Sequence, residues 1–189
     1  MNSKYNKQEW SDATGKISIE KWEQLKKVEI TPQVCKEHWQ TSGVEMRNAQ
    51  EVDDYGATPG KWFYTPLQVP CGTKENPFNK NMSDPQLAYH GCSLDAAVEI
   101  LRNKVIKIGP NCHEDKIGVY CERQARKGSC YMYASNSTPI PETGLLSACI
   151  FELQVDRAVG MTVNRQWVQP ENSIVITGIY THLQFHKVV

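Results

Sequence analysis

The chain has 189 residues, enough for one domain with a sizeable core, and its 21 Lys and Arg residues balance its 21 Asp and Glu residues. A net charge of zero argues against a standing attraction to nucleic acid or to an anionic membrane surface. No apolar stretch approaches the roughly 20 residues of a membrane-spanning helix. The first ten residues, MNSKYNKQEW, lack the apolar region of a secretory signal. We therefore expect a cytoplasmic or nuclear protein that is not secreted and has no membrane partner.

The seven cysteines are odd in number and widely spaced, and no two have the CxxC spacing of zinc ribbons. Cys112, His113, Cys121 and Cys130 could in principle meet at a metal, but close-spaced ligand pairs are missing. We expect no metal, and we expect reduced thiols that pack as small apolar side chains.

Residues 1–84 are predicted to form an extension of helices and loops ahead of the main domain. Apolar residues recur at helical spacing within residues 19–25, which predicts an amphipathic helix. Thr31 followed by Pro32 is typical of the start of a second, short helix. Residues 55–84 are rich in Pro, Gly and Asn, so we expect a loop with one edge strand at most.

Residues 85–189 are predicted to form an α+β domain with short strands and few helices. A short extended segment ends at His90, and Ser93 is a good N-cap for a helix that stops near Asn103. Breakers and apolar alternation predict the remaining elements, which are strands at Gly118–Cys121, Leu145–Val155 and Ile174–Val189 (interrupted at Gly178) and a helix at Gln124–Ala134.

Three short motifs stand in order in this domain. They are Tyr89-His90-Gly91 before a helix, Gly118-Val119-Tyr120 with Tyr131 eleven residues after Tyr120, and Pro170-Glu171 before a terminal strand. This order resembles the catalytic domain of ADP-ribosyltransferases of the diphtheria-toxin and poly(ADP-ribose) polymerase type. In that family a His-Gly pair ends a strand, a Gly-Ile/Val-Tyr strand leads to a second Tyr, and a catalytic Glu starts a late strand. The resemblance covers about residues 85–182.

The resemblance implies the ADP-ribosyltransferase-like fold, with split antiparallel β-sheets and an NAD cleft. It also implies an NAD-dependent mono-ADP-ribosyltransferase that moves ADP-ribose from NAD to a protein or nucleic-acid acceptor and releases nicotinamide. The nicotinamide ring would stack on Tyr120 and Tyr131, and His90 would hydrogen-bond a ribose hydroxyl. Glu171 would stabilise the positive charge that develops on the ribose as nicotinamide leaves. The remaining residues assigned to NAD binding are Gly91, Lys127 and Ser129.

Two positions depart from the family pattern. The family usually has Ser three residues before the second Tyr, where this chain has Gly128 with Ser129 one step along. Strict alignment of the last strand puts Asn172 in the catalytic position, whereas one inserted residue restores Glu171. The sequence Gln169-Pro170-Glu171 also matches the Gln-x-Glu element of the arginine-directed toxin branch, but the Arg and Ser-Thr-Ser elements of that branch are not visible.

Two other functions remain open. A module of the same fold that binds NAD or ADP-ribose without transferring it would keep the cleft and lack the catalytic Glu. An RNA 2′-phosphotransferase shares the fold and a similar His-Gly start, but it depends on Arg and His residues grouped near its N-terminus. No such group is found in this chain.

Overall fold

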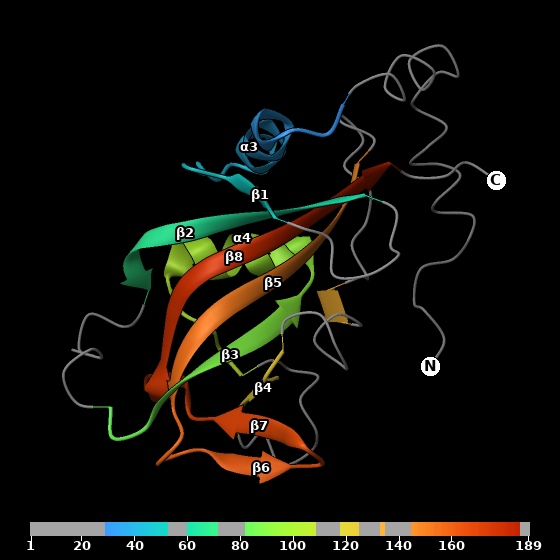
Figure 1. Cartoon of the computed structure of the whole chain (residues 1–189). Coiled ribbons are helices and arrows are strands. Elements are labelled where there is room, and N and C mark those ends of the chain that lie inside the picture. The colour runs from blue at the N-terminus through green and yellow to red at the C-terminus, as the bar shows by residue number, and fades with distance from the viewer. Residues whose placement is uncertain are drawn as a thin grey trace.

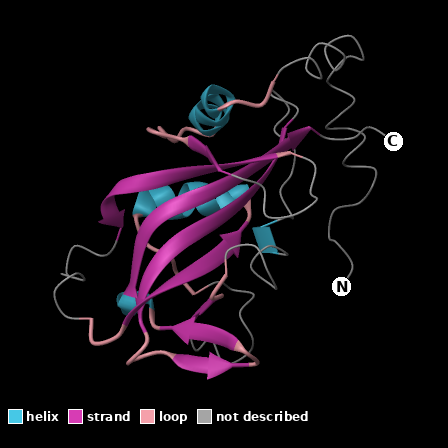
Figure 2. Ribbon diagram, in the orientation of Figure 1, coloured by secondary structure: helices cyan, strands magenta, loops and turns pink. Residues whose placement is uncertain are grey.

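A five-stranded antiparallel sheet, sheet A, organises the computed structural model, which describes residues 29–52, 60–71, 82–108, 118–124, 133–134 and 145–185 (Figures 1 and 2). From edge to edge its strands are β1 (Gln50–Val52), β2 (Lys61–Cys71), β8 (Ile174–Phe185), β5 (Leu145–Asp156) and β3 (Pro85–Cys92). A second antiparallel sheet, sheet B, contains β4 (Val119–Cys121), β7 (Gln166–Gln169) and β6 (Met161–Val163). With few helices beside two antiparallel sheets, the protein belongs to the α+β class, as expected.

Helices α3 and α4 begin where their N-cap residues predict. In α3 (Pro32–Thr41) the Thr31 side chain accepts a hydrogen bond from the Val34 amide, at 3.3 Å. In α4 (Leu94–Asn103) Ser93 Oγ accepts one from the Ala96 amide, also at 3.3 Å. In the part of the chain that the structure describes, no helix is long and apolar enough to cross a membrane.

Residues on both sides of the expected boundary at 84/85 share one sheet. Strand β2 pairs with β1 on one side and with β8 on the other, so the expectation of an edge strand at most is wrong for residues 61–71. Alternation explains the strand, because Phe63 is buried against the helices while its neighbour Tyr64 faces the other side. Pro66 is tolerated because the register shifts between it and Cys71.

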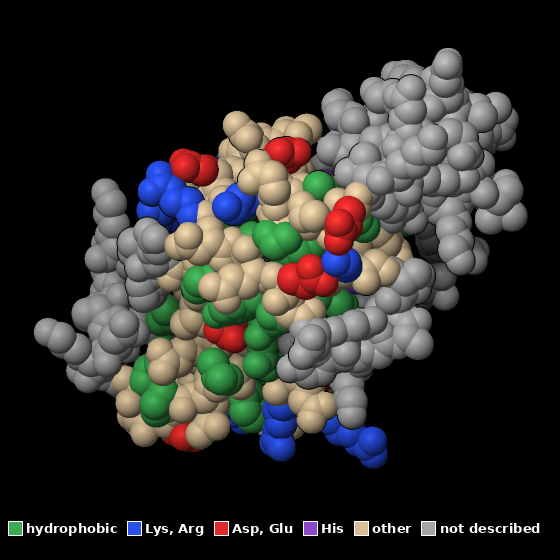
Figure 3. Space-filling model, turned by 45° about the horizontal axis from the view of Figure 1, so that its top comes forward, with side chains coloured by type: hydrophobic (Ala, Val, Ile, Leu, Met, Phe, Trp, Pro, Cys, Tyr) green, Lys and Arg blue, Asp and Glu red, His purple; other side chains and the backbone are tan. Residues whose placement is uncertain are grey.

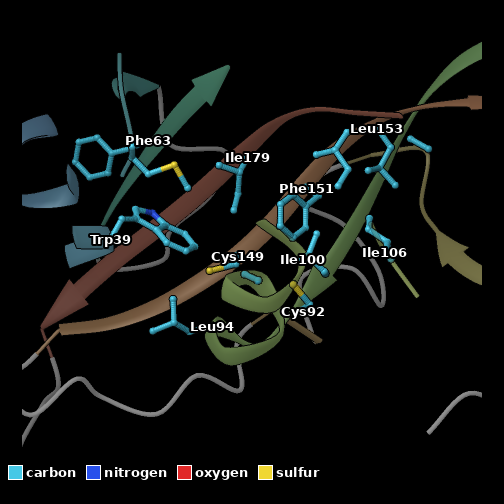
Figure 4. Packing of buried hydrophobic residues seen from close by; sticks show 14 of the residues in the cluster. Trp39, Phe63, Cys92, Leu94, Ile100, Ile106, Cys149, Phe151, Leu153 and Ile179 are labelled. Atoms are coloured by element: carbon cyan, nitrogen blue, oxygen red, sulfur yellow. The ribbon is translucent and has the colours of Figure 1, made fainter. Parts of the chain in front are cut away.

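The main core lies on the face of sheet A that α3 and α4 cover (Figures 1 and 4). Trp39 from α3 is fully buried there, and its indole Nε1 donates a 3.0 Å hydrogen bond to Thr181 of β8. Helices α3 and α4 and strands of both sheets contribute side chains, including Trp39, Phe63, Leu94, Ile100, Phe151, Leu153 and Ile179. The described residues before position 84 therefore contribute to the same core as the later ones.

Two features of the C-terminal strands differ from the sequence prediction. Strand β8 continues through Gly178, but its register with β5 shifts there, because Glu152 pairs with Gly178 and Leu153 with Ile176, which leaves Thr177 as an extra residue in β8. The β6–β7 hairpin was not predicted, because its turn has Asn164 and Arg165 at φ values of 49° and 70°, and Arg is not a typical residue for that region. The predicted helix at residues 19–25 lies outside the described residues. Of the predicted helix at 124–134 only residues 124, 133 and 134 are described, and 133–134 are helical.

Cys35, Cys92, Cys121 and Cys149 are buried free thiols. Cys92 of β3 and Cys149 of β5 stand directly opposite each other in the sheet. Burial, and next the nearby Cys92 and Cys35, raises the pKa of the Cys149 thiol, and burial raises that of Cys35 to about 12. Cys112, His113 and Cys130 lie outside the described residues, so of the candidate metal ligands only Cys121 has a known position.

Candidate functional site

Strands β3 and β4 meet at a bridge that brings the first two sequence motifs together. The amides of Tyr89 and Glu122 each donate a 2.8 Å hydrogen bond to the other's carbonyl. One residue further on, His90 Nδ1 lies 2.9 Å from the Tyr120 carbonyl oxygen. A carbonyl oxygen only accepts, so Nδ1 carries the proton and Nε2 is the acceptor of the neutral ring. Burial lowers the pKa of His90, which favours this neutral form.

Tyr120 sits in the middle of β4, between two residues that belong to the core. Val119 and Cys121 are buried, and because side chains alternate along a strand, the Tyr120 ring points away from that core. It is half-buried. Gly91, which follows His90, is buried opposite Ile150 of β5. The structure therefore places His90, Gly91 and Tyr120 around the bridge between β3 and β4.

Glu171 lies in a short 3-10 helix, η2 (Glu171–Ser173), which connects β7 of sheet B to β8 of sheet A. Its side chain is exposed and accepts a hydrogen bond from the Ile108 amide. The next strand, β8, starts at Ile174, which lies level with Gln86 of β3 across sheet A. Gln86 is about 13 Å along β3 from His90. No hydrogen bond joins Glu171 to His90 or Tyr120 in the described residues.

The remaining residues assigned to NAD binding, Lys127, Ser129 and Tyr131, lie outside the described residues. Tyr133 and Ala134 are the nearest described residues after this segment. Tyr133 is 62% exposed, whereas Ala134 is buried against Trp62, Ala148 and Ile150 on the face of sheet A away from the helices.

A second cluster of polar side chains on that face was missed by sequence reasoning. Glu152 of β5 is half-buried there, and its Oε1 accepts 2.8 Å hydrogen bonds from Tyr64 Oη and from Thr177 Oγ1. The Tyr180 hydroxyl is 3.4 Å from Oε2, and the Tyr89 ring packs edge-on against the Tyr180 ring. These five residues, from four strands, are named here the Glu152 cluster.

The signal for this cluster was present only in part. Glu152 stands between Phe151 and Leu153, two buried residues, so alternation alone assigns it to a solvent-facing position of the strand. Its partners are 25 to 88 residues away in the sequence, and only the strand register brings them together. The cluster also depends on a glycine at position 178, because a Cβ atom on Gly178 would lie 2.5 Å from the Tyr64 hydroxyl oxygen.

At the level of class, the observed architecture is an α+β fold of two antiparallel sheets that meet at the β3–β4 bridge. Comparison with known proteins finds no family model that matches the chain. No curated protein matches it either.

Proposed function

We propose that this protein is an NAD-dependent mono-ADP-ribosyltransferase with the ADP-ribosyltransferase-like fold, acting on a protein or nucleic-acid acceptor. The observation that supports the proposal best is the hydrogen bond from His90 Nδ1 to the Tyr120 carbonyl. Two motifs that lie 30 residues apart in the sequence, and that the resemblance assigns to one NAD site, are thereby in direct contact.

The residues around the β3–β4 bridge have the chemistry that NAD binding requires. His90 Nε2, as an acceptor on a ring oriented by its other nitrogen, suits a ribose hydroxyl. Gly91 lets a ligand approach the backbone, because it has no side chain. Tyr120 offers an aromatic face to the cationic nicotinamide ring. When bound, NAD would supply the activated ribose whose bond to nicotinamide breaks in the transfer.

Glu171 remains the candidate for stabilising positive charge on the ribose, with Asn172 as the alternative in the same position. Its hydrogen bond from the Ile108 amide connects η2 to the segment that follows α4. A ligand that binds the Glu171 carboxylate would therefore have to break that hydrogen bond or bind to the other carboxylate oxygen.

The test is release of nicotinamide from NAD by the purified full-length chain, with and without added cell extract as the source of acceptors. We expect turnover, and we expect His90→Ala to reduce kcat/KM by at least tenfold while the folded content by circular dichroism stays unchanged. Glu45→Gln, at an exposed residue paired with Arg47, is the matched control and should leave turnover unchanged. Binding of NAD without any turnover would favour the second candidate, a binding module of the same fold.

A further inference from the structure

We propose that the Glu152 cluster binds an organic cation with N–H donors, the guanidinium or ammonium group of an arginine or lysine side chain of a partner protein. The proposal does not depend on NAD chemistry, because Tyr89 and His90 are neighbours in β3 and their side chains point to opposite faces of sheet A.

The first argument is charge. The groups that hydrogen-bond to the Glu152 carboxylate are neutral hydroxyls, from Tyr64, Thr177 and Tyr180. No Lys, Arg or His forms an ion pair with it among the described residues. A carboxylate removed in part from water normally has a cationic partner. The Glu152 carboxylate is half-buried and has only hydroxyl partners among the described residues, so it suits a cation from outside.

The second argument concerns which carboxylate oxygen is available. Oε1 accepts two hydrogen bonds of 2.8 Å, whereas Oε2, within the described part of the chain, accepts only the long 3.4 Å contact from Tyr180. A carboxylate oxygen has two acceptor sites, so Oε2 retains capacity for a strong donor. Charge-assisted N–H bonds to carboxylates are the strong ones, and guanidinium and primary ammonium groups both provide them.

The third argument is the aromatic surround. The rings of Tyr64 and Tyr180 have centroids 4.8 Å apart, and those of Tyr89 and Tyr180 are 6.2 Å apart and steeply inclined. Faces and edges of several rings next to one carboxylate suit a cation, which is attracted by the ring quadrupoles as well as by the charge. The cluster thus combines an anion with aromatic walls.

The surroundings suit a long, partly apolar side chain. Leu87 precedes Tyr89 by two residues, hence lies on the same face, and is 56% exposed. It would cover the aliphatic stem of an arginine or lysine whose charged end reaches Glu152. Figure 3, in which this face of sheet A is seen obliquely, shows hydrophobic side chains gathered on the surface with acidic groups among them.

The experiment is a titration followed by NMR of protein with labelled tyrosine rings, using N-acetyl-arginine amide, N-acetyl-lysine amide and tetramethylammonium as separate probes. We expect the ring signals of Tyr64, Tyr89 and Tyr180 to shift with millimolar affinity for the first two probes. Whichever of them binds tighter identifies the side chain. Tetramethylammonium should bind at least fivefold more weakly, because it has no N–H donor for Oε2.

Glu152→Gln keeps the shape and the acceptor oxygen but removes the charge, so affinity should fall at least tenfold. Glu99→Gln, an exposed carboxylate on α4 at the covered face, is the matched control and should leave affinity unchanged. If Glu152→Gln does not fold, Tyr89→Leu serves instead, and it should weaken binding several-fold. Absence of ring shifts with both amides, unchanged affinity in either variant, or equal binding of tetramethylammonium would each overturn the proposal.

Discussion

His90 illustrates how one backbone contact sets the chemistry of a side chain. Because the Tyr120 carbonyl accepts from Nδ1, the ring can present only Nε2 to a ligand, and only as an acceptor while the ring is neutral. Protonation of Nε2 would remove this acceptor. The lowered pKa of His90 therefore extends the range over which a ribose hydroxyl could be bound toward lower pH.

The tyrosines assigned to the nicotinamide ring give the first prediction at this scale. Tyr120→Ala and Tyr131→Ala should each weaken binding of a nicotinamide-like inhibitor by about 1–3 kcal/mol, if stacking energies on nucleic-acid bases apply to this ring. Tyr133→Ala is the control, since Tyr133 is 62% exposed. Titration calorimetry decides the matter. Equal losses at all three positions would remove the support for this choice of residues.

Glu171 gives the second. If its carboxylate acts only as nicotinamide leaves, Glu171→Gln should reduce turnover by roughly 10²–10³ while NAD affinity barely changes. Asn172→Ala should stay within a few-fold of the unmodified protein. Steady-state kinetics together with an independent binding measurement separate the two effects. A silent Glu171→Gln beside a severely impaired Asn172→Ala would mean that the strict alignment of the last strand is the right one.

Among the elements, α4 depends on its first residue. Ser93→Ala removes the acceptor for the Ala96 amide and should lower the free energy of unfolding by about 1 kcal/mol. Ser93→Asp keeps an acceptor and adds a charge that suits the helix N-terminus, so it should restore most of that loss. Urea denaturation of the three proteins measures both changes, and a full loss in Ser93→Asp would contradict the capping role.

Elements defined by local signals were predictable, and those defined by distant partners were not. Both helix starts followed from Thr31 and Ser93, and the strand around His90 followed from its apolar pattern and the helix after it. Strand β2 was expected to be an edge strand at most because its prolines argue locally for a loop, whereas its pairing with β1 and β8 puts it inside the sheet. Of the candidate site, the sequence placed His90 and Tyr120 in the right elements, but it contained no sign that Glu152 would meet Tyr64.

At the scale of the whole molecule, a buried histidine makes stability depend on pH. His38 is fully buried in α3, and neither ring nitrogen has a hydrogen-bond partner among the described residues. Burial lowers its pKa from 6.5 to about 4. Between these values the unfolded chain binds a proton that the folded protein does not, so stability falls as the pH decreases through this window.

We therefore expect the folded protein to lose about 3 kcal/mol of stability between pH 7 and pH 4 on account of His38. His90 contributes in the same direction, because its pKa is also lowered. The Asp156 carboxyl, whose pKa is lowered from 3.8 chiefly by the Ser83 amide, acts only below this window. Denaturation of His38→Leu across the same pH range should show a smaller loss than the unmodified protein, and an equal loss would contradict the assignment.

The three core thiols on α3, β3 and β5 give the molecule internal reporters of its own opening. Cys35, Cys92 and Cys149 are buried, and the raised pKa values of Cys35 and Cys149 suppress the thiolates that alkylating reagents need. Each thiol can therefore be labelled only when its element separates from the core. If α3 detaches before the sheet opens, Cys35 will be labelled ahead of Cys149, and if the core opens as one unit, all three will be labelled at the same rate.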